Sequence, residues 1–91
     1  MDFEWDDPKA AANAEKHGVT FEEAQTAFDD PLFLAFVDPD HSMDERRFIL
    51  LAESNLGRLL VVSYTERAES LRIISAREAT KKERKAYEED L

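Results

Sequence analysis

The order of hydrophobic and polar residues predicts two helices in the first third of the chain. The first begins with Asp7 as its cap and Pro8 behind it, because an acceptor side chain followed by proline favours a helix start. Its alanine-rich stretch ends at Gly18, a residue that readily adopts the left-handed conformation found after helices. A second helix is predicted from Phe21, with Thr20 as its cap.

From Pro31 onward the pattern changes to short apolar runs, which are typical of strands. Such runs occupy residues 32–37, 46–52, 58–65 and 70–76. The links between them are too short for helical crossovers, so we expect a four-stranded antiparallel sheet. A capping box formed by Thr80 and Glu83 predicts a last helix through about Asp90. The predicted fold is therefore a single α+β domain over residues 1–91, with two N-terminal helices, the sheet and a C-terminal helix.

The composition excludes several classes of protein. The chain has 91 residues and no cysteine, so it can form one small core but no disulfide, thiolate metal site or cysteine nucleophile, which suits the cytoplasm. No apolar run approaches the roughly 18 residues of a membrane span, and we expect no membrane partner. With two glycines, no phosphate-binding loop and no serine in a nucleophile-elbow context, we expect neither a cofactor nor a hydrolase triad.

The acidic loop over residues 38–45 invites comparison with a calcium-binding loop. Counted from Asp38, the sixth position is Met43 where such loops have glycine, and the twelfth is Ile49 where they have glutamate. The match fails, so we expect a solvated turn, with a weak divalent-ion site as the alternative.

The formal net charge of −9 argues at first against a nucleic-acid ligand, because phosphates are bound by lysine and arginine. The charge is unevenly distributed, however. Residues 1–45 contain thirteen acidic and two basic residues, a charge of −11, whereas residues 46–87 carry +5. Either the two halves pack against each other and keep the protein soluble, or the basic half is a working surface with an acidic flank.

A strip of basic residues follows the last two predicted strands and the final helix: Arg58, Arg67, Arg72, Arg77, Lys81, Lys82, Arg84 and Lys85. Strand alternation predicts Arg77 on the same face as Leu71 and Ile73, with Arg72 on the other. The planar guanidinium of Arg77 would match two phosphate oxygens at the mouth of a groove between sheet and helix. The alternative is a structural ion pair between Arg77 and the N-terminal acids.

Cleavage of RNA without a metal needs a base for the 2′-hydroxyl, an acid for the leaving 5′-oxygen and cations for the charged transition state. Side chains able to transfer protons are His17, Glu53, Tyr64, Tyr87 and Lys81. Two of these side chains, His17 and Tyr87, also have a purely structural explanation. His17 lies in the last turn of a helix, where its protonated form would stabilise the helix by interacting with the helix dipole. Tyr87 has the amphipathic character of an aromatic residue at the edge of a core.

The chain resembles the BrnT family, the toxins of a bacterial type II toxin–antitoxin system, in three segments. They are FEWDDPKAAANAEKHGVTFEEA (residues 3–24), DPDHS (residues 38–42) and RLLVVSYTERAESLRIISAREATKKERKAYE (residues 58–88). The resemblance implies a RelE-like ribonuclease fold and a toxin that arrests growth by cutting RNA. It also implies a BrnA-like ribbon-helix-helix antitoxin as partner, with operator DNA contacted only through that antitoxin.

Position by position, the resemblance points to residues 16–18, 64–67 and 74–77, and to Glu83 with Tyr87. We therefore take four residues as catalytic candidates: Arg77, His17, Arg67 and Tyr87. Six others are expected to bind RNA: Arg58, Arg72, Lys81, Lys82, Arg84 and Lys85. No metal or cofactor is expected.

Two functions from different classes remain open on the sequence. The first is a metal-independent endoribonuclease toxin neutralised by a bound antitoxin, and the basic strip supports it. The second is a protein-interaction module with weak or no nuclease activity, whose acidic half binds a basic antitoxin-like partner. An unrelated small acidic α+β protein is a third possibility.

Overall fold

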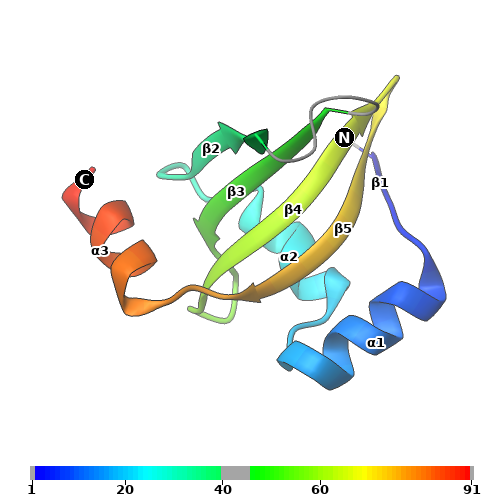
Figure 1. The fold of residues 1–91 in the computed structure, drawn as a ribbon, viewed down its shortest axis with the longest axis horizontal. Helices are drawn as coiled ribbons and strands as arrows, with labels where there is room; N and C mark the ends of the chain where they lie inside the picture. The colour runs from blue at the N-terminus through cyan, green and yellow to red at the C-terminus, as the bar shows by residue number, and fades with distance from the viewer. Residues whose placement is uncertain (1, 40–45, 91) are drawn as a thin grey trace.

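The computed structural model describes residues 2–39 and 46–90, which form a five-stranded sheet and three helices (Figure 1). In chain order the elements are β1 (Asp2–Glu4), α1 (Asp7–His17), α2 (Phe21–Ala27), β2 (Leu34–Val37), β3 (Arg47–Glu53), β4 (Leu59–Arg67), β5 (Ser70–Glu78) and α3 (Lys81–Glu89). The strand order in the sheet is β1-β5-β4-β3-β2. The predicted α+β class and the placement of the helices are confirmed.

The prediction of a four-stranded antiparallel sheet is wrong, because residues 2–4 form a fifth strand that runs parallel to β5. In this strand Phe3 lies opposite Leu71, at the other end of the chain. Three residues are too short to show strand alternation, and only the tertiary structure supplies their partner. The other neighbouring strands are antiparallel, as expected.

The helix ends follow the predicted chemistry with one shift. The cap of α1 is Asp6, whose carboxylate accepts a hydrogen bond from the Lys9 amide at 3.0 Å, and Asp7 is the first helical residue. Gly18 ends α1 with a φ of 68°, in the left-handed region that glycine tolerates. Thr20 caps α2 through the amide of Glu23, as predicted.

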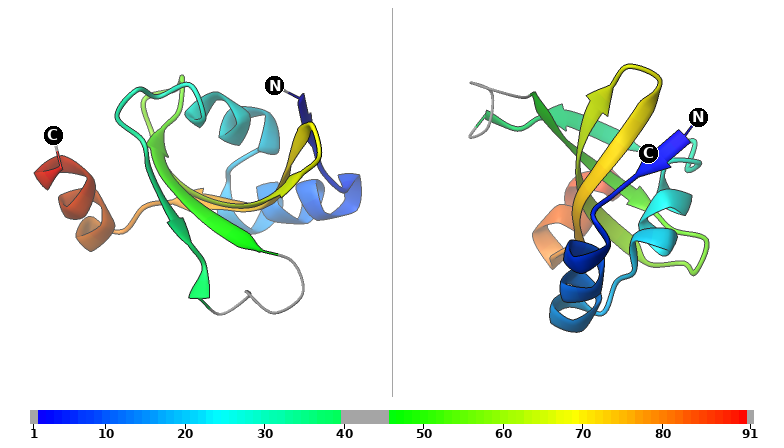
Figure 2. Two further views of the ribbon diagram at one scale, coloured as in Figure 1. Left: turned by 90° about the horizontal axis from the view of Figure 1, so that it is seen from above. Right: turned by 90° about the vertical axis from the view of Figure 1, so that its right-hand side faces the viewer.

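The two faces of the sheet have different covers. On one face, α1 and α2 pack over the central strands and enclose the main core, which includes Phe21, Leu60, Val62 and Ile73 (Figure 2). On the other face, α3 packs Tyr87 against Leu51, Leu59 and Val61. The helix α3 lies at the β2–β3 side of the sheet (Figure 1). Its apolar contacts therefore end at Val61 and do not reach the rest of this second face, which β4 and β5 form. We call that part the open face.

A buried asparagine joins α1 to the edge of β5. Only Ser70 to Arg72 of β5 pair with β1, so the later residues of β5 lie at an edge among the described strands. The Asn13 amide donates to the Ala76 carbonyl at 2.8 Å, and the Ala76 amide donates back to Asn13 Oδ1 at 3.1 Å. A further bond from the Asn13 amide reaches the Val19 carbonyl at 2.9 Å. Asn13 therefore supplies the hydrogen bonds that a neighbouring strand would otherwise provide.

An irregularity between β4 and β5 changes which side chains share a face. Ser63 lies opposite Ser75, but the next residue of β4, Tyr64, lies opposite Ile73, so β5 contains one extra residue at Ile74. Such a bulge reverses the alternation of the strand beyond it. The prediction that Arg77 shares a face with Ile73 is therefore wrong.

The same bulge sets the positions of two arginines. Arg72 lies opposite Thr65 and Arg77 opposite Val61, and these two β4 residues are four apart on one face. Arg72 and Arg77 consequently lie together on the open face, whereas Ile73 and Ala76 both enter the main core.

A buried ion pair fixes the β3–β4 turn against the helices. Glu23 is buried in α2, and its carboxylate accepts hydrogen bonds from Arg58 Nε at 3.0 Å, from Arg58 Nη2 and from Ser54 Oγ at 2.7 Å. Arg58 Nη2 also donates to the Gly18 carbonyl at 3.0 Å. The hydrogen bonds from Arg58 lower the pKa of Glu23 against the opposing effect of its burial. Glu23 thus stays charged and joins three segments of the chain.

The junction between β5 and α3 is held by Arg77 and Glu83. Arg77 Nη1 and Nη2 each donate to one carboxylate oxygen of Glu83 at 2.8 Å. Glu83 also completes the predicted capping box, because its Oε1 accepts from the Thr80 amide at 2.8 Å. The hydrogen bonds from Arg77 are the largest influence on Glu83, and they lower its pKa to about 2. The ion pair of Arg77 is therefore with Glu83, whereas the sequence suggested the N-terminal acids.

A second contact anchors the far end of α3. The Tyr87 hydroxyl donates to Asp30 Oδ2 at 2.6 Å, and the same oxygen accepts from the Glu53 amide at 2.9 Å. Burial and the bond to Asp30 raise the pKa of Tyr87 to about 12. Asp30 thereby links the α2–β2 loop, β3 and α3.

Replacement of Asn13 by alanine should reduce the free energy of unfolding by about 2–3 kcal/mol, because it leaves buried main-chain groups of Ala76 without partners. Urea unfolding measures the change. Glu15→Ala, on the exposed side of α1, is the control and should stay within about 0.5 kcal/mol. An Asn13→Ala protein as stable as this control would contradict the role given to Asn13.

The Arg77–Glu83 pair should contribute acid sensitivity. Because the pKa of Glu83 falls from 4.5 to about 2, the folded state binds fewer protons than the unfolded state in this range, and the stabilisation is lost as pH drops through it. The free energy of unfolding, measured by denaturant at a series of pH values, should therefore depend less steeply on pH in Glu83→Gln than in the natural chain. Glu88→Gln, on the exposed side of the same helix, should follow the natural chain. Identical slopes for all three proteins would contradict the assignment.

Candidate nucleic-acid interface

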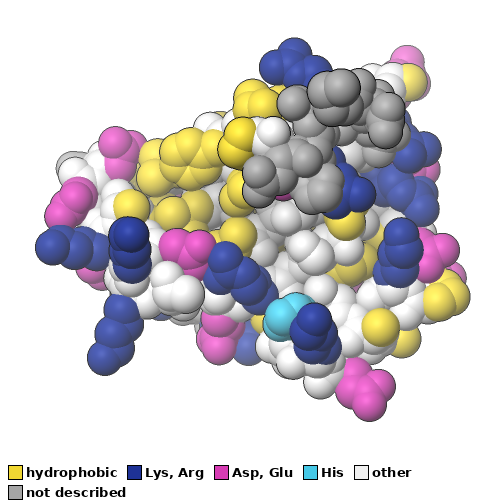
Figure 3. All heavy atoms as spheres, in the orientation of Figure 1, with side chains coloured by type: hydrophobic (Ala, Val, Ile, Leu, Met, Phe, Trp, Pro, Cys, Tyr) yellow, Lys and Arg dark blue, Asp and Glu magenta, His cyan; other side chains and the backbone are white. Residues whose placement is uncertain are grey.

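The open face has uncharged side chains at its centre and basic side chains around its margin. Ser63 and Ser75 lie opposite each other at its centre, and Ser63 also lies opposite Ile49 of β3. Arg77 lies two residues beyond Ser75 on the same face. Figure 3 views this side of the molecule and shows lysine, arginine and histidine side chains around a mostly uncharged area. Such a surface can hold a phosphate backbone around its rim.

One end of the uncharged centre is bounded by two arginines in register. Arg47 of β3 and Arg72 of β5 lie opposite Thr65 of β4, one on each side, so the three residues form a row across the open face. Sequence reasoning placed Arg72 among the RNA ligands but omitted Arg47. The alternation of β3, in which Arg47 shares a face with Ile49 and Leu51, was the signal that could have found it.

The other boundary comes from the end of α1. Lys16, His17 and Asn13 of this helix line a depression of about 260 Å³ together with Ile74 and Ser75 of β5. Both Lys16 and His17 are exposed. The depression places His17 beside the bulged part of β5, next to the central serine of the open face. The structure therefore places His17 beside Ser75, on the strand that also carries Arg72 and Arg77.

Arg77 retains the capacity to bind an anion despite its ion pair. Its guanidinium has five N–H donors, of which three are used, two by Glu83 and one by the Glu78 carbonyl at 3.1 Å. Its bonds to Glu83 raise the pKa of Arg77, so the charge is permanent. Glu83 thus orients the guanidinium and leaves two donors for a ligand.

Arg67 and Arg72 are paired more loosely. Both lie near Glu4 of β1, with N···O distances of 3.9 Å for Arg67 and 4.0 Å for Arg72. Ion pairs of this length between partly exposed groups contribute little to stability. A phosphate could therefore compete with Glu4 for Arg72 at small cost.

Other predicted site residues lie elsewhere. Arg58 is bound to Glu23 and Gly18 on the helix side of the sheet, and the Tyr87 hydroxyl is bound to Asp30 at the α3 end. The basic residues of α3 are exposed on the outside of the helix: Lys81, Lys82, Arg84 and Lys85. Lys85 lies 3.9 Å from Glu89 on the same helix. Arg58 and the Tyr87 hydroxyl are therefore engaged by partners outside the open face.

No cluster of metal-ligand type is found in the described part of the chain: residues 2–39 and 46–90 hold no group of three or more His, Asp or Glu side chains suited to a metal ion. Most of the loop tested above for calcium, residues 40–45, lies outside the described residues. Among the described helices, none is long and apolar enough to cross a membrane.

Residues 5–83 match the family model described as the ribonuclease toxin, BrnT, of type II toxin-antitoxin systems. Among solved structures, the crystal structure of the Brucella abortus ribonuclease toxin BrnT is similar with a TM-score of 0.66 and 28% sequence identity. The similarity covers 89% of this chain and 99% of that one. No curated protein sequence matches.

The match over residues 5–83 includes α1, the arginine-bearing strands β3, β4 and β5, and the start of α3, and so spans every element that builds the open face. This chain belongs to the BrnT family of ribonuclease toxins of type II toxin–antitoxin systems.

Proposed function

We propose that this protein is an endoribonuclease toxin that binds and cuts RNA on its open face without a metal ion. The observation that carries the proposal is the bulge at Ile74, after which Arg72 and Arg77 share one face, together with the depression in which His17 lies beside Ile74 and Ser75. Family membership supports the reaction class. The RelE-like fold implied by the sequence resemblance is part of this proposal.

The chemistry that these side chains can perform is attack of the RNA 2′-oxygen on the neighbouring phosphorus. The 2′-oxygen–phosphorus bond forms and the bond to the 5′-oxygen breaks, which leaves a 2′,3′-cyclic phosphate and a free 5′-hydroxyl. The base takes the 2′-hydroxyl proton, and the departing 5′-oxygen receives a proton. We assign proton transfer to His17, the exposed imidazole that borders the open face among the described residues. His17 takes the 2′-hydroxyl proton, and the resulting imidazolium gives a proton to the departing 5′-oxygen.

Stabilisation of the charged transition state falls to Arg77. Two of its N–H donors remain after its bonds to Glu83 and Glu78, and the fork geometry suits two phosphate oxygens. Donors that are already oriented need no reorganisation when charge develops, which is the basis of electrostatic catalysis. Arg72, Arg47 and Lys16 would hold flanking phosphates, with Arg67 at the edge.

Tyr87 is left out of the reaction in this proposal. Its hydroxyl is bound to Asp30, and its pKa of about 12 makes it a poor proton donor near neutral pH. Arg58 is left out as well, since its guanidinium is bound to Glu23 and the Gly18 carbonyl.

The partner follows from the family, whose type II systems pair each toxin with an antitoxin. We propose that this antitoxin is a BrnA-like ribbon-helix-helix protein, that operator DNA is contacted through it, and that both act in the cytoplasm.

An alternative function for this chain is a weakly active or inactive module whose task is to bind this partner. The apolar, exposed side chains of β2 favour the alternative, because RNA cleavage does not need them.

Arg77→Ala and His17→Ala should each reduce RNA cleavage in EDTA at least ~10-fold, equivalent to ~1.4 kcal/mol of transition-state stabilisation. Cleavage of a labelled RNA by purified protein is the measurement. Arg84→Ala removes an exposed arginine of α3 and should leave the rate within about twofold.

A second variant separates the catalytic role of Arg77 from its structural one. Glu83→Gln breaks the ion pair to α3 but keeps the guanidinium, so it should retain more cleavage than Arg77→Ala. Equal losses in the two variants would show that Arg77 acts only by holding α3. A natural chain that cuts no RNA in EDTA but binds its antitoxin would support the interaction module, and cleavage restored by Mg²⁺ would refute metal independence.

A further inference from the structure

The β2 strand carries an unusual concentration of exposed apolar side chains. Leu32 and Phe33, which precede the strand, are 51% and 49% exposed, and Phe36 and Val37 within it are 51% and 45% exposed. We call these four residues the β2 patch. Phe36 and Val37 are consecutive in the strand and so lie on opposite faces of the sheet edge. Large apolar side chains exposed on both faces of one edge mark a place where another molecule binds.

The main chain at this place is also available. β2 is the last strand of the sheet order, and among the described strands only β3 pairs with it. The Asp38 amide donates to the Arg47 carbonyl at 2.8 Å, so the register makes Phe36–Ile49 and Leu34–Leu51 the hydrogen-bonded pairs. The N–H and C=O groups of Ala35 and Val37 therefore point away from β3. An extended peptide could pair with them as an additional strand.

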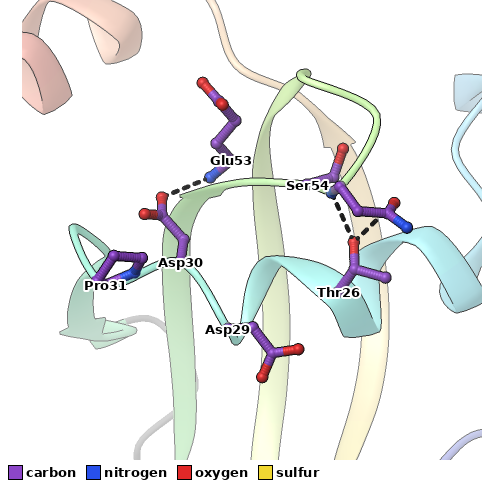
Figure 4. Close-up of a pocket in the computed structure, with 7 residues that line it drawn as sticks. Thr26, Asp29, Asp30, Pro31, Glu53 and Ser54 are labelled. Carbon is purple, nitrogen blue, oxygen red and sulfur yellow. Dashed lines mark hydrogen bonds between the residues drawn. The ribbon is translucent and has the colours of Figure 1, made fainter.

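The Pro31 end of the β2 patch is acidic, which favours a ligand with basic side chains. Between Lys16 and Arg46 the sequence contains no lysine or arginine. Asp29 and Glu53 border a depression of about 390 Å³ next to Pro31 (Figure 4). Asp30 in the same depression is already bound to the Leu32 amide, the Glu53 amide and Tyr87. The carboxylates of Asp29 and Glu53 point in different directions in Figure 4, and each keeps this end of the patch acidic.

We propose that the outer edge of β2 binds an extended segment of the antitoxin, which adds to the sheet as a sixth strand. Its apolar side chains cover Phe36 on one face of the strand and Val37 on the other, and a lysine or arginine lies at the Pro31 end beside Asp29 or Glu53. This proposal rests on the antitoxin partner named above and adds the surface that it occupies. The acidic surround disfavours RNA at this edge, and two copies of a chain with a net charge of −9 would repel each other there.

The β2 patch does not overlap the centre of the open face. Phe36 lies opposite Ile49 and Ser63 lies opposite Ile49 on its other side, so the patch and the centre of the open face are separated by one strand. A segment added at β2 can therefore bind without displacing Arg77 or His17, and the rest of the antitoxin would extend from it.

The test is binding of the antitoxin encoded beside this gene, measured by titration calorimetry with the full-length chain. Phe36→Lys should weaken binding at least ~10-fold, because it places an exposed charge within the apolar contact. Leu56→Lys is the matched control. Leu56 is another large exposed apolar side chain, on the β3–β4 turn, and its replacement should leave affinity within about twofold. Thermal unfolding checks that both variants are folded.

Hydrogen exchange of single amides tests the added strand itself. The amides of Ala35 and Val37 should exchange at least ~10-fold more slowly in the complex than in the free chain, whereas those of Leu34 and Phe36, bonded to β3, should already be protected. Unchanged exchange at Ala35 and Val37 would overturn strand addition. Phe36→Lys binding as tightly as the natural chain would overturn the patch as the docking surface.

Two further readouts distinguish the other occupants. A free chain that is dimeric by light scattering, and monomeric as Phe36→Lys, would assign the patch to self-association and overturn the proposal. Protection of Ala35 and Val37 by RNA instead of the antitoxin would do the same. All of these readouts are binding or exchange, so they hold whether or not the chain cuts RNA, and failure of either proposal is recognised separately.

Discussion

The hydrogen bonds between Asn13 and Ala76 determine how the two parts of the candidate site meet. They tie α1 to β5 just after the bulge, where a sheet edge would otherwise expose unpaired main-chain groups. Because α1 ends at His17, this attachment brings the end of the helix beside Ser75. The bulge in turn places Arg72 and Arg77 on the same face. Without the Asn13–Ala76 bonds or without the bulge, the imidazole of His17 and the two arginines would no longer border a common surface.

The arginines of this protein divide by the geometry of their partners. Arg58 forms short, multiple bonds with buried Glu23, and such a pair is costly to break because it would leave a buried charge. Arg72 is 4.0 Å from a partly exposed Glu4 and can exchange it for another anion. Arg77 combines both properties, since two of its nitrogens bind Glu83 and unused donors remain. Partner geometry therefore separates structural cations from available ones, which a count of charges cannot do.

The uneven charge of the sequence acquires a spatial meaning in the fold. The acidic first half supplies Glu23 and Asp30, which hold the turn after β3 and the end of α3. It also supplies Asp29 beside the exposed edge of β2. The basic second half supplies the arginines of the open face. One small sheet thus presents a basic face on β4 and β5 and an apolar, acidic edge at β2, and these suit different ligands.

The sequence by itself determined the local features of this protein. Thr20, Thr80 with Glu83, and Gly18 define helix ends through short-range hydrogen bonds and backbone conformation, so they could be found without a structure. The family resemblance was also visible there, and the match over residues 5–83 confirmed it. Only the tertiary structure decided the parallel pairing of β1, the bulge at Ile74 and the partners of Arg58, Arg77 and Tyr87. Each of these depends on contacts between residues distant in the chain, where local propensity and strand alternation carry no information.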